Sequence, residues 1–207
     1  MKKIFRILFL SALLLEGIHA RPQEKQSSGS SEADMRGRCV PVISLAEDSL
    51  AYQAGEHLKF TVHYSWGVIN SDVGVATVDL DTLRINGEKV FHCAVYGKTV
   101  SWYDLLFKVR EDFQAWFSAD GIVPLKFTRN TREGRYRAKN TYTYMWDMPE
   151  PLIAADVFTS SSGQRYVQLP LDHCTYDLPA LFFMARNMDF DAVAPGVRYP
   201  MTFAIDD

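Results

Sequence analysis

Three carboxylates come nearest to a catalytic set in this sequence. They are Asp104, Glu111 and Glu133. Glycoside hydrolysis needs one carboxyl group as an acid and a second as a base or nucleophile, held at a defined separation. Each residue also has a structural interpretation, because an acid after Trp102-Tyr103 closes a turn and an acid in a strand pairs with a cross-strand cation. We therefore nominate no catalytic residue and keep a glycan-active hydrolase with paired carboxylates as the alternative function.

Other reactive residue types form no recognisable motif. Ser160 to Gly163 is typical of a hairpin tip and lacks the glycine on both sides of the serine that a nucleophile elbow requires. His173 and Cys174 are adjacent, but spacings such as His-x-x-x-His or Cys-x-x-Cys do not occur in the sequence. It also contains no phosphate loop and no dinucleotide fingerprint. We predict that the protein holds no metal and no cofactor.

The first 20 residues have the organisation of a secretion signal. Basic residues precede an apolar run over 7–15, and small residues ending at Ala20 suit cleavage there. A membrane-spanning helix needs about 20 apolar residues, so we expect no transmembrane segment after cleavage. Residues 21–38 are typical of a flexible polar tether, and a single β-rich domain is expected over 39–207. The protein is therefore predicted to be periplasmic or secreted.

The charge balance of the chain argues against nucleic acid as a partner. Residues 1–20 contain three of the 22 basic and one of the 25 acidic residues, which leaves 19 against 24 and a net charge of −5. Such a chain has no general attraction for phosphate backbones. The densest basic stretch contains Arg129, Arg132, Arg135, Arg137 and Lys139. Because the last three alternate with other residues, they are predicted to form the solvated face of a strand, with an anionic glycan or lipid head group as the functional alternative.

Most of the domain alternates apolar and polar side chains, as β-strands do. With 47% hydrophobic residues the chain is also too apolar to be disordered. Alternating segments occur over 58–66, 73–83, 89–95, 107–117, 125–127, 136–146 and 199–205. Asn86-Gly87 is the strongest hairpin signal, since both turn positions need a positive φ. Short strands with close turns predict an all-β fold, an antiparallel meander that forms a curved sheet or a half-open barrel.

One short helix near 177–188 is expected to interrupt the strands. Asp177 is a suitable N-cap, and Pro179 suits a first turn, where its missing N–H group has no partner to lose. The apolar stripe of this helix comprises Leu178, Leu181, Phe182 and Ala185. We expect the helix to cover one end or the concave side of the sheet, which otherwise exposes apolar surface.

Several short segments carry a family resemblance. They include Gly55-Glu56, Tyr64-Ser65-Trp66-Gly67, Phe107-Lys108-Val109-Arg110-Glu111, Glu133-Gly134-Arg135-Tyr136 and Ala185-Arg186-Asn187-Met188-Asp189-Phe190. In this order they resemble the exported bacterial family known as domain of unknown function 3108, common in Bacteroides-like organisms. The family implies a periplasmic or cell-surface all-β domain without an assigned activity. It also implies further residues after Asp207, so the domain is expected to be incomplete at its C-terminus.

Three cysteines are an odd number for an oxidising compartment. Cys93 lies within an alternating strand segment and is interpreted as a small buried apolar residue. Cys39 precedes the first strand and Cys174 precedes the helix, both in irregular segments that can meet. We therefore predict a disulfide between Cys39 and Cys174.

Aromatic residues exceed what a small core needs, and this excess suggests a ligand site. The candidate ligand-binding residues are Phe60, Val62, Tyr64, Trp66, Tyr142 and Tyr144. Half-open antiparallel sheets hold apolar ligands in their concavity, although core packing explains aromatic residues as well. The predicted function is a non-catalytic exported domain that binds a hydrophobic ligand, namely an acyl chain, a lipid or an apolar peptide. A glycan is the other partner considered, and the oligomeric state is not predicted.

Overall fold

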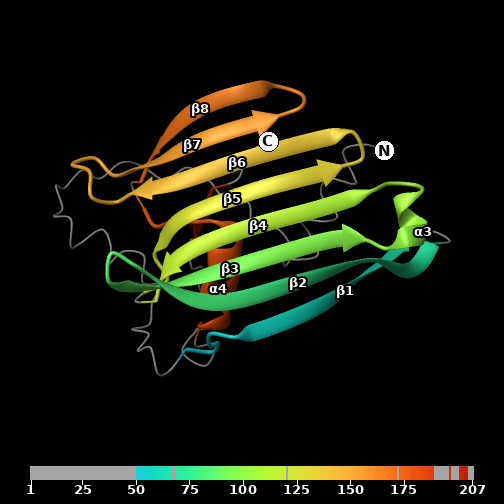
Figure 1. Cartoon of the computed structure of the whole chain (residues 1–207), viewed down its shortest axis with the longest axis horizontal. Helices are drawn as coiled ribbons and strands as arrows, with labels where there is room; N and C mark the ends of the chain where they lie inside the picture. Colours follow the sequence, from blue (N-terminus) through green and yellow to red (C-terminus); the bar gives the residue numbers. More distant parts are fainter. Residues whose placement is uncertain are drawn as a thin grey trace.

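The computed structural model describes residues 50–66, 69–119, 121–171, 173–188, 196 and 201–204 of the 207-residue chain. Its main element is one antiparallel sheet whose eight strands lie side by side in chain order (Figure 1). The strands are β1 (Glu56–Trp66), β2 (Ile69–Ile85), β3 (Glu88–Thr99), β4 (Val109–Ser118), β5 (Pro124–Glu133), β6 (Tyr136–Met145), β7 (Leu152–Thr159) and β8 (Gly163–Pro170). In the described part of the chain β1 and β8 are the two edges and do not pair with each other. The predicted all-β meander is confirmed, as an open sheet.

Close turns set the register of this sheet. Asn86 and Gly87 have φ angles of 52° and 87° and connect β2 to β3, as the sequence predicts. Gly134, with a φ of 58°, lies in the turn between β5 and β6. The second strand differs from the expected range, since it begins at Ile69 rather than near residue 73. The reason is that its pairing with β1 continues to Ile69 opposite Trp66, past a bulge that the alternating pattern does not reveal.

The two faces of the sheet differ in burial. Every second residue of β4 is buried, from Val109 to Phe117, and the residues between them are only partly buried. We refer to the side that carries these buried residues as the inner face and to the opposite side as the outer face. The inner-face core includes Leu80, Phe91, Cys93, Ala115, Phe117, Phe127, Tyr142, Ile153 and Val157. Its period of two explains why β1 to β6 are recognisable in the sequence, whereas β7 and β8 were not predicted.

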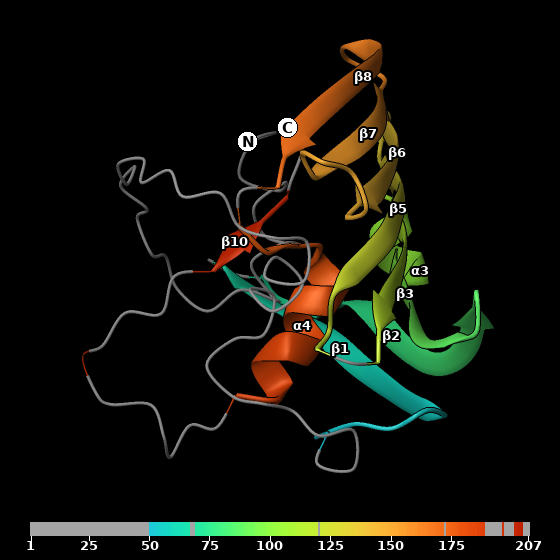
Figure 2. The same cartoon turned by 90° about the vertical axis from the view of Figure 1, so that its left-hand side faces the viewer.

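Helix α4 (Leu178–Arg186) packs on the inner face, while no described element covers the outer face (Figure 2). Its N-cap is Asp177, whose Oδ1 accepts a hydrogen bond of 2.9 Å from the amide of Ala180. Phe183 is fully buried, and its ring lies 4.7 Å from that of Tyr52 and 5.7 Å from that of Phe117. The helix predicted near 177–188 is therefore confirmed, and it covers the concave side of the sheet. Its buried face differs from the predicted stripe, since Pro179, Ala180, Phe183 and Met184 are buried whereas Leu178, Leu181, Phe182 and Ala185 are only partly buried.

Three short elements complete the described structure. Helix α3 (Ser101–Asp104) follows β3, and the strands β9 (Thr175–Tyr176) and β10 (Thr202–Phe203) form a parallel pair. Helix α3 was not predicted, because a single turn is too short to show a helical period in the sequence. Of the segment expected to alternate over 199–205, only residues 201–204 are described. Among the described residues, no helix is long and apolar enough to cross a membrane.

We predict that Phe183→Ala lowers the free energy of unfolding by about 3–5 kcal/mol, because it removes the aromatic ring that joins α4 to the sheet. Chemical denaturation followed by tryptophan fluorescence measures this change. Leu105→Ala is the matched control, since Leu105 is 88% exposed and its loss should change the stability little. Equal effects of the two substitutions would contradict the assignment of Phe183 to the core.

Candidate functional site

Four cations lie in one row across the outer face. The strand register places Lys98 opposite Arg110, Arg110 opposite Arg132, and Arg132 opposite Arg137. Adjacent strands are about 4.8 Å apart, so the row extends about 14 Å across β3 to β6. Like charges that face each other across strands are destabilising. The row is therefore a feature that the stability of the sheet does not explain.

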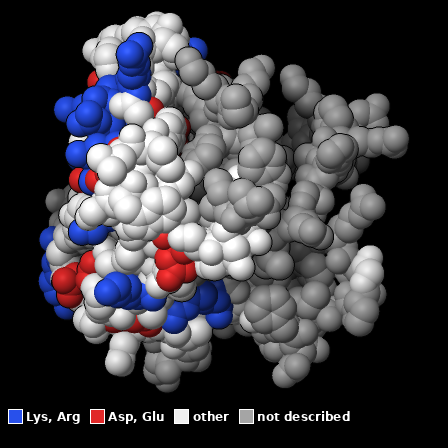
Figure 3. Space-filling view, turned by 90° about the vertical axis from the view of Figure 1, so that its right-hand side faces the viewer, with Lys and Arg blue, Asp and Glu red and all other residues white. Residues whose placement is uncertain are grey.

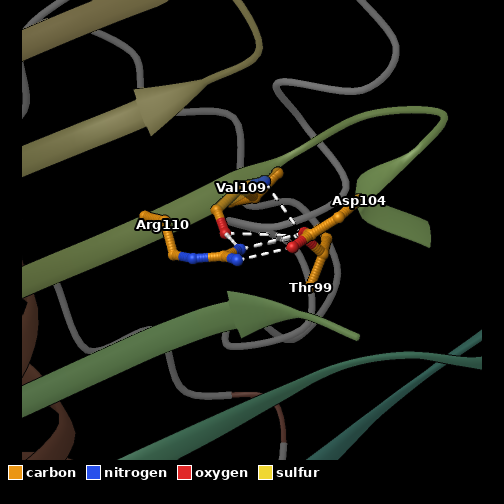
Figure 4. Close-up of polar contacts among 4 residues, drawn as sticks. All are labelled: Thr99, Asp104, Val109 and Arg110. Atoms are coloured by element: carbon orange, nitrogen blue, oxygen red, sulfur yellow. Dashed lines mark hydrogen bonds and ion pairs between the residues drawn. The ribbon is translucent and has the colours of Figure 1, made fainter. Parts of the chain in front are cut away.

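One member of the row, Arg110, is held by an acid from α3 (Figure 4). Its Nη2 lies 2.5 Å from Asp104 Oδ2, and its Nη1 donates to Asp104 Oδ1 at 3.0 Å. The hydroxyl of Thr99 also donates to Asp104, and it accepts a hydrogen bond of 3.0 Å from the amide of Val109. The hydrogen bonds from Arg110 and Thr99 hold the pKa of Asp104 well below its usual range. Asp104 is thus an ionised partner of Arg110 and is unsuited to act as a general acid.

Arg137 is held in a different way, by neutral groups. Its Nη1 donates to the carbonyl oxygens of Gly134 and Tyr136, at 3.0 and 2.9 Å. Carbonyl groups fix the direction of a guanidinium but do not neutralise its charge. Arg137 is therefore positioned on the outer face with its positive charge uncompensated by these bonds.

The row borders a groove of about 580 Å³, a volume within the usual range of small-ligand sites. The groove is lined by Val75, Thr77, Tyr96, Gly97, Lys98, Arg110, Glu111, Asp112, Asn130, Arg132 and Arg137. The Glu111 side chain belongs to the inner face, so Asp112 is the acid of this lining whose side chain lies on the outer face. In the space-filling view, Lys and Arg side chains gather along the outer side of the sheet, at the left margin (Figure 3).

A second row of polar groups runs beside the cations. Thr77, Tyr96, Asp112 and Asn130 are cross-strand partners in sequence across β2 to β5. Gln114 orients two of them, since its Nε2 donates to Tyr96 Oη at 3.1 Å and to Asp112 Oδ1 at 2.6 Å. Tyr96 is nevertheless 48% exposed. The groove thus combines positive charge with hydrogen-bonding groups and one exposed aromatic ring.

The predicted carboxylates do not converge on an accessible cleft. Asp104 is paired with Arg110 of the outer face, whereas Glu111 lies on the inner face with an exposed fraction of only 7%. The hydroxyl of Thr131 donates to Glu111, and Arg129 Nε donates to that hydroxyl oxygen at 2.8 Å. Burial raises the pKa of Glu111 to about 7, although Thr131 and the charge of Arg129 oppose the shift. A substrate cannot reach a carboxyl group enclosed in this way.

Five of the six candidate residues for an apolar ligand lie on the inner face, in two places. Phe60, Val62 and Tyr64 belong to β1, whereas Tyr142 and Tyr144 belong to β6, with four strands between them. The two β6 tyrosines are 3% and 6% exposed and form part of the core. Phe60 is 41% exposed and packs edge-on against Phe182 at 6.5 Å. Trp66 ends β1, and its side chain is outside the described part of the structure.

The cysteine predictions are resolved only in part. Cys93 is a free, buried residue of β3, as expected. Cys174 is partly buried against the core, whereas Cys39 lies outside the described residues. The disulfide between Cys39 and Cys174 therefore stays a prediction.

Sequence reasoning missed most of the groove. It considered Arg132 and Arg137 as part of a basic stretch but did not connect them with Lys98 or Arg110. A usable signal exists in the turn at Gly134-Arg135, because a hairpin that closes there makes Arg132 and Arg137 partners. The remaining pairs depend on α3 and on a bulge at Leu125 of β5, which no local sequence pattern predicts.

In the part of the chain that the structure describes, the fold and this groove define a mostly β domain, in which α4 packs on the inner face of an eight-stranded sheet whose outer face is open and basic. By comparison with known families, the chain belongs to DUF3108, a family of proteins of unknown function, whose model matches residues 59–207. This match confirms the resemblance noted in the sequence. Neither the curated proteins nor the solved structures contain a match.

Glu111 leads to a prediction about the pH dependence of stability. An acid whose folded pKa is raised stabilises the fold when it is protonated, so its contribution is lost as the pH rises from about 4.5 to about 7. Glu111→Gln keeps an oxygen that accepts from Thr131 and cannot ionise. We expect the variant to lose less stability than the parent protein between pH 5 and pH 8, by up to about 3 kcal/mol.

Urea denaturation at several pH values measures this difference. Part of the pH dependence should persist in the variant, because burial also raises the pKa of Asp177 to about 7. Parallel stability curves for the two proteins would contradict the buried state of Glu111.

Proposed function

We propose that this protein is a non-catalytic, exported binding domain that takes an anionic ligand in the outer groove. The single observation that carries this proposal is the row of Lys98, Arg110, Arg132 and Arg137 in direct cross-strand register. Export is supported by the signal-like organisation of residues 1–20. A binding role is supported by the groove itself, and the inaccessibility of Glu111 argues against a hydrolase.

The charge count favours an anion as the ligand. The four cations of the row face two acids, Asp112 in the groove and Asp104 beside it, so two positive charges remain in excess. Mutual repulsion raises the energy of the empty groove, and a ligand with at least two negative charges relieves it. Arg110 and Arg137 are held in place before binding, which lowers the entropic cost of contacting such a ligand.

We expect Arg132→Gln to weaken the binding of anions by at least about tenfold. The reason is that the variant loses one charge-assisted contact, which contributes about 1.5 kcal/mol to binding. Lys126→Gln is the matched control, since it removes the same charge from the outer face of the same strand, outside the groove. Calorimetric titration with tripolyphosphate and with a panel of carboxylated, sulfated and phosphorylated oligosaccharides measures both variants. Binding should also weaken as the salt concentration rises. Binding by no anion, or equal losses in the two variants, would overturn the proposal.

A hydrophobic ligand on the inner face is the second candidate function. It is favoured by the exposed ring of Phe60, which packs against the partly buried Phe182 at the β1 edge, and by the exposed side chains of Val167 and Leu169 at the β8 edge. Apolar side chains left in water at the edges of a core are suitable contacts for an acyl chain or an apolar peptide. The separation of β1 from β6 means that such a ligand would contact one edge rather than all six candidate residues together.

For this second function we expect protein purified from its native envelope to carry a lipid that native mass spectrometry detects. Phe60→Ser should reduce the lipid-bound fraction severalfold, because it removes the exposed ring at the β1 edge. Phe158→Ser is the control, since Phe158 is a similarly exposed phenylalanine on the outer face. The absence of lipid from the parent protein, or equal lipid loss in both variants, would exclude the inner-face site.

A further inference from the structure

We infer that the ligand of the outer groove is an acidic saccharide, a sugar that presents both negative groups and hydroxyl groups. This inference rests on the proposed function, because it requires that the groove binds anions. It adds the chemical class of the ligand, and it follows from the second row of side chains rather than from the cations.

The two rows of the groove offer two different chemistries at a short distance. The row Thr77, Tyr96, Asp112, Asn130 lies two residues along the strands from the cationic row, which corresponds to about 7 Å. This separation is comparable to the width of one sugar ring. A sugar acid can therefore direct its negative group to Arg110 or Arg132 and its ring hydroxyls to the polar row.

Asp112 is the residue that distinguishes a saccharide from a simple polyanion. Its charge repels a ligand that consists only of negative groups, so it weakens the binding of phosphate chains. Toward a saccharide it acts as an acceptor of charge-assisted hydrogen bonds from hydroxyl groups. Its Oδ1 accepts from Gln114 at 2.6 Å, and this bond fixes the carboxylate while Oδ2 remains for a ligand.

Tyr96 adds a flat apolar surface beside these polar groups. Almost half of this side chain is exposed, although Gln114 holds its hydroxyl at 3.1 Å. An exposed ring that is fixed at its polar tip offers a face for the C–H groups of a sugar ring at a low entropic cost. Asn130 contributes an amide with both donors and acceptors, which suits hydroxyl groups better than phosphate oxygens alone.

Lipid head groups and inorganic polyphosphate are the competing anions. A membrane surface would use the cations together with the exposed apolar side chains of Trp102, Leu105 and Leu106, which lie beside the Asp104–Arg110 pair, but Asp112 would repel its anionic head groups. Polyphosphate would use the cationic row and gain nothing from Asp112. The polar row therefore favours the saccharide over both.

The test compares ligands and variants in one titration series. The parent protein, Arg132→Gln, Asp112→Ala, Tyr96→Ala and Thr128→Ala are titrated with the best acidic oligosaccharide of the panel, its neutral parent sugar and tripolyphosphate. Vesicles of phosphatidylglycerol in phosphatidylcholine form a fourth arm. Thr128 lies on the outer face of β5 outside the groove, so its variant is the control, and unfolding midpoints establish that each variant folds.

We expect the acidic oligosaccharide to bind at least about tenfold more tightly than tripolyphosphate and than its neutral parent. Asp112→Ala should weaken saccharide binding about tenfold while it strengthens tripolyphosphate binding, and Tyr96→Ala should weaken only the saccharide. The inference would be overturned if tripolyphosphate or the vesicles bound as tightly as every acidic oligosaccharide, or if Asp112→Ala strengthened the binding of all anions alike. Either result would leave the proposed binding of anions intact. Binding by no anion in any arm would overturn the proposed function as well.

Discussion

The register of four neighbouring strands is the constraint on which the outer face depends. A tight turn at Gly134 pairs Arg132 with Arg137, and the β4–β5 connection pairs Arg110 with Arg132. A shift of one residue in either pairing would move a cation of the row to the inner face, where it would be buried without a counterion. The hydrophobic core on the inner face prevents such a shift. Core packing on one side thus fixes the charge pattern on the other.

The ion pair between Asp104 and Arg110 connects the end of the sheet to this pattern. Helix α3 lies in the connection between β3 and β4. At the ends of this connection the amide of Val109 donates a hydrogen bond of 3.0 Å to the hydroxyl oxygen of Thr99. Asp104 neutralises one guanidinium in the middle of the row, which reduces repulsion without removing the excess of positive charge. Asp104, one of the carboxylates that come nearest to a catalytic set in the sequence, therefore serves to position Arg110 within the cationic row.

The inner face combines apolar packing with a small buried polar network. Glu111, Thr131 and Arg129 lie among the aromatic residues of the core, and Arg129 also covers the ring of Phe113 at 6.0 Å. Burial of Glu111 makes the stability of the sheet depend on pH, because the carboxyl group is best tolerated when it is neutral. The groove and this network occupy opposite sides of the same strands. A single substitution in the groove can therefore be made without altering the buried network, and a substitution in the network can be made without altering the groove.

The sequence by itself determined the strands from β1 to β6, the hairpin at Asn86-Gly87 and the presence of the helix capped by Asp177, because local periodicity and turn chemistry encode them. It also determined which residues of β6 face inward, since Tyr142 and Tyr144 alternate with polar neighbours. It did not reveal β7 and β8, and β8 is almost entirely exposed, so it carries no pattern of burial. Only the tertiary structure decided that four strands separate Phe60 from Tyr144, and that Lys98 and Arg137 share a row. A period of two assigns a residue to a face but carries no information about its position across the sheet. That position depends on turns, bulges and the packing of α4, which act between residues far apart in the chain.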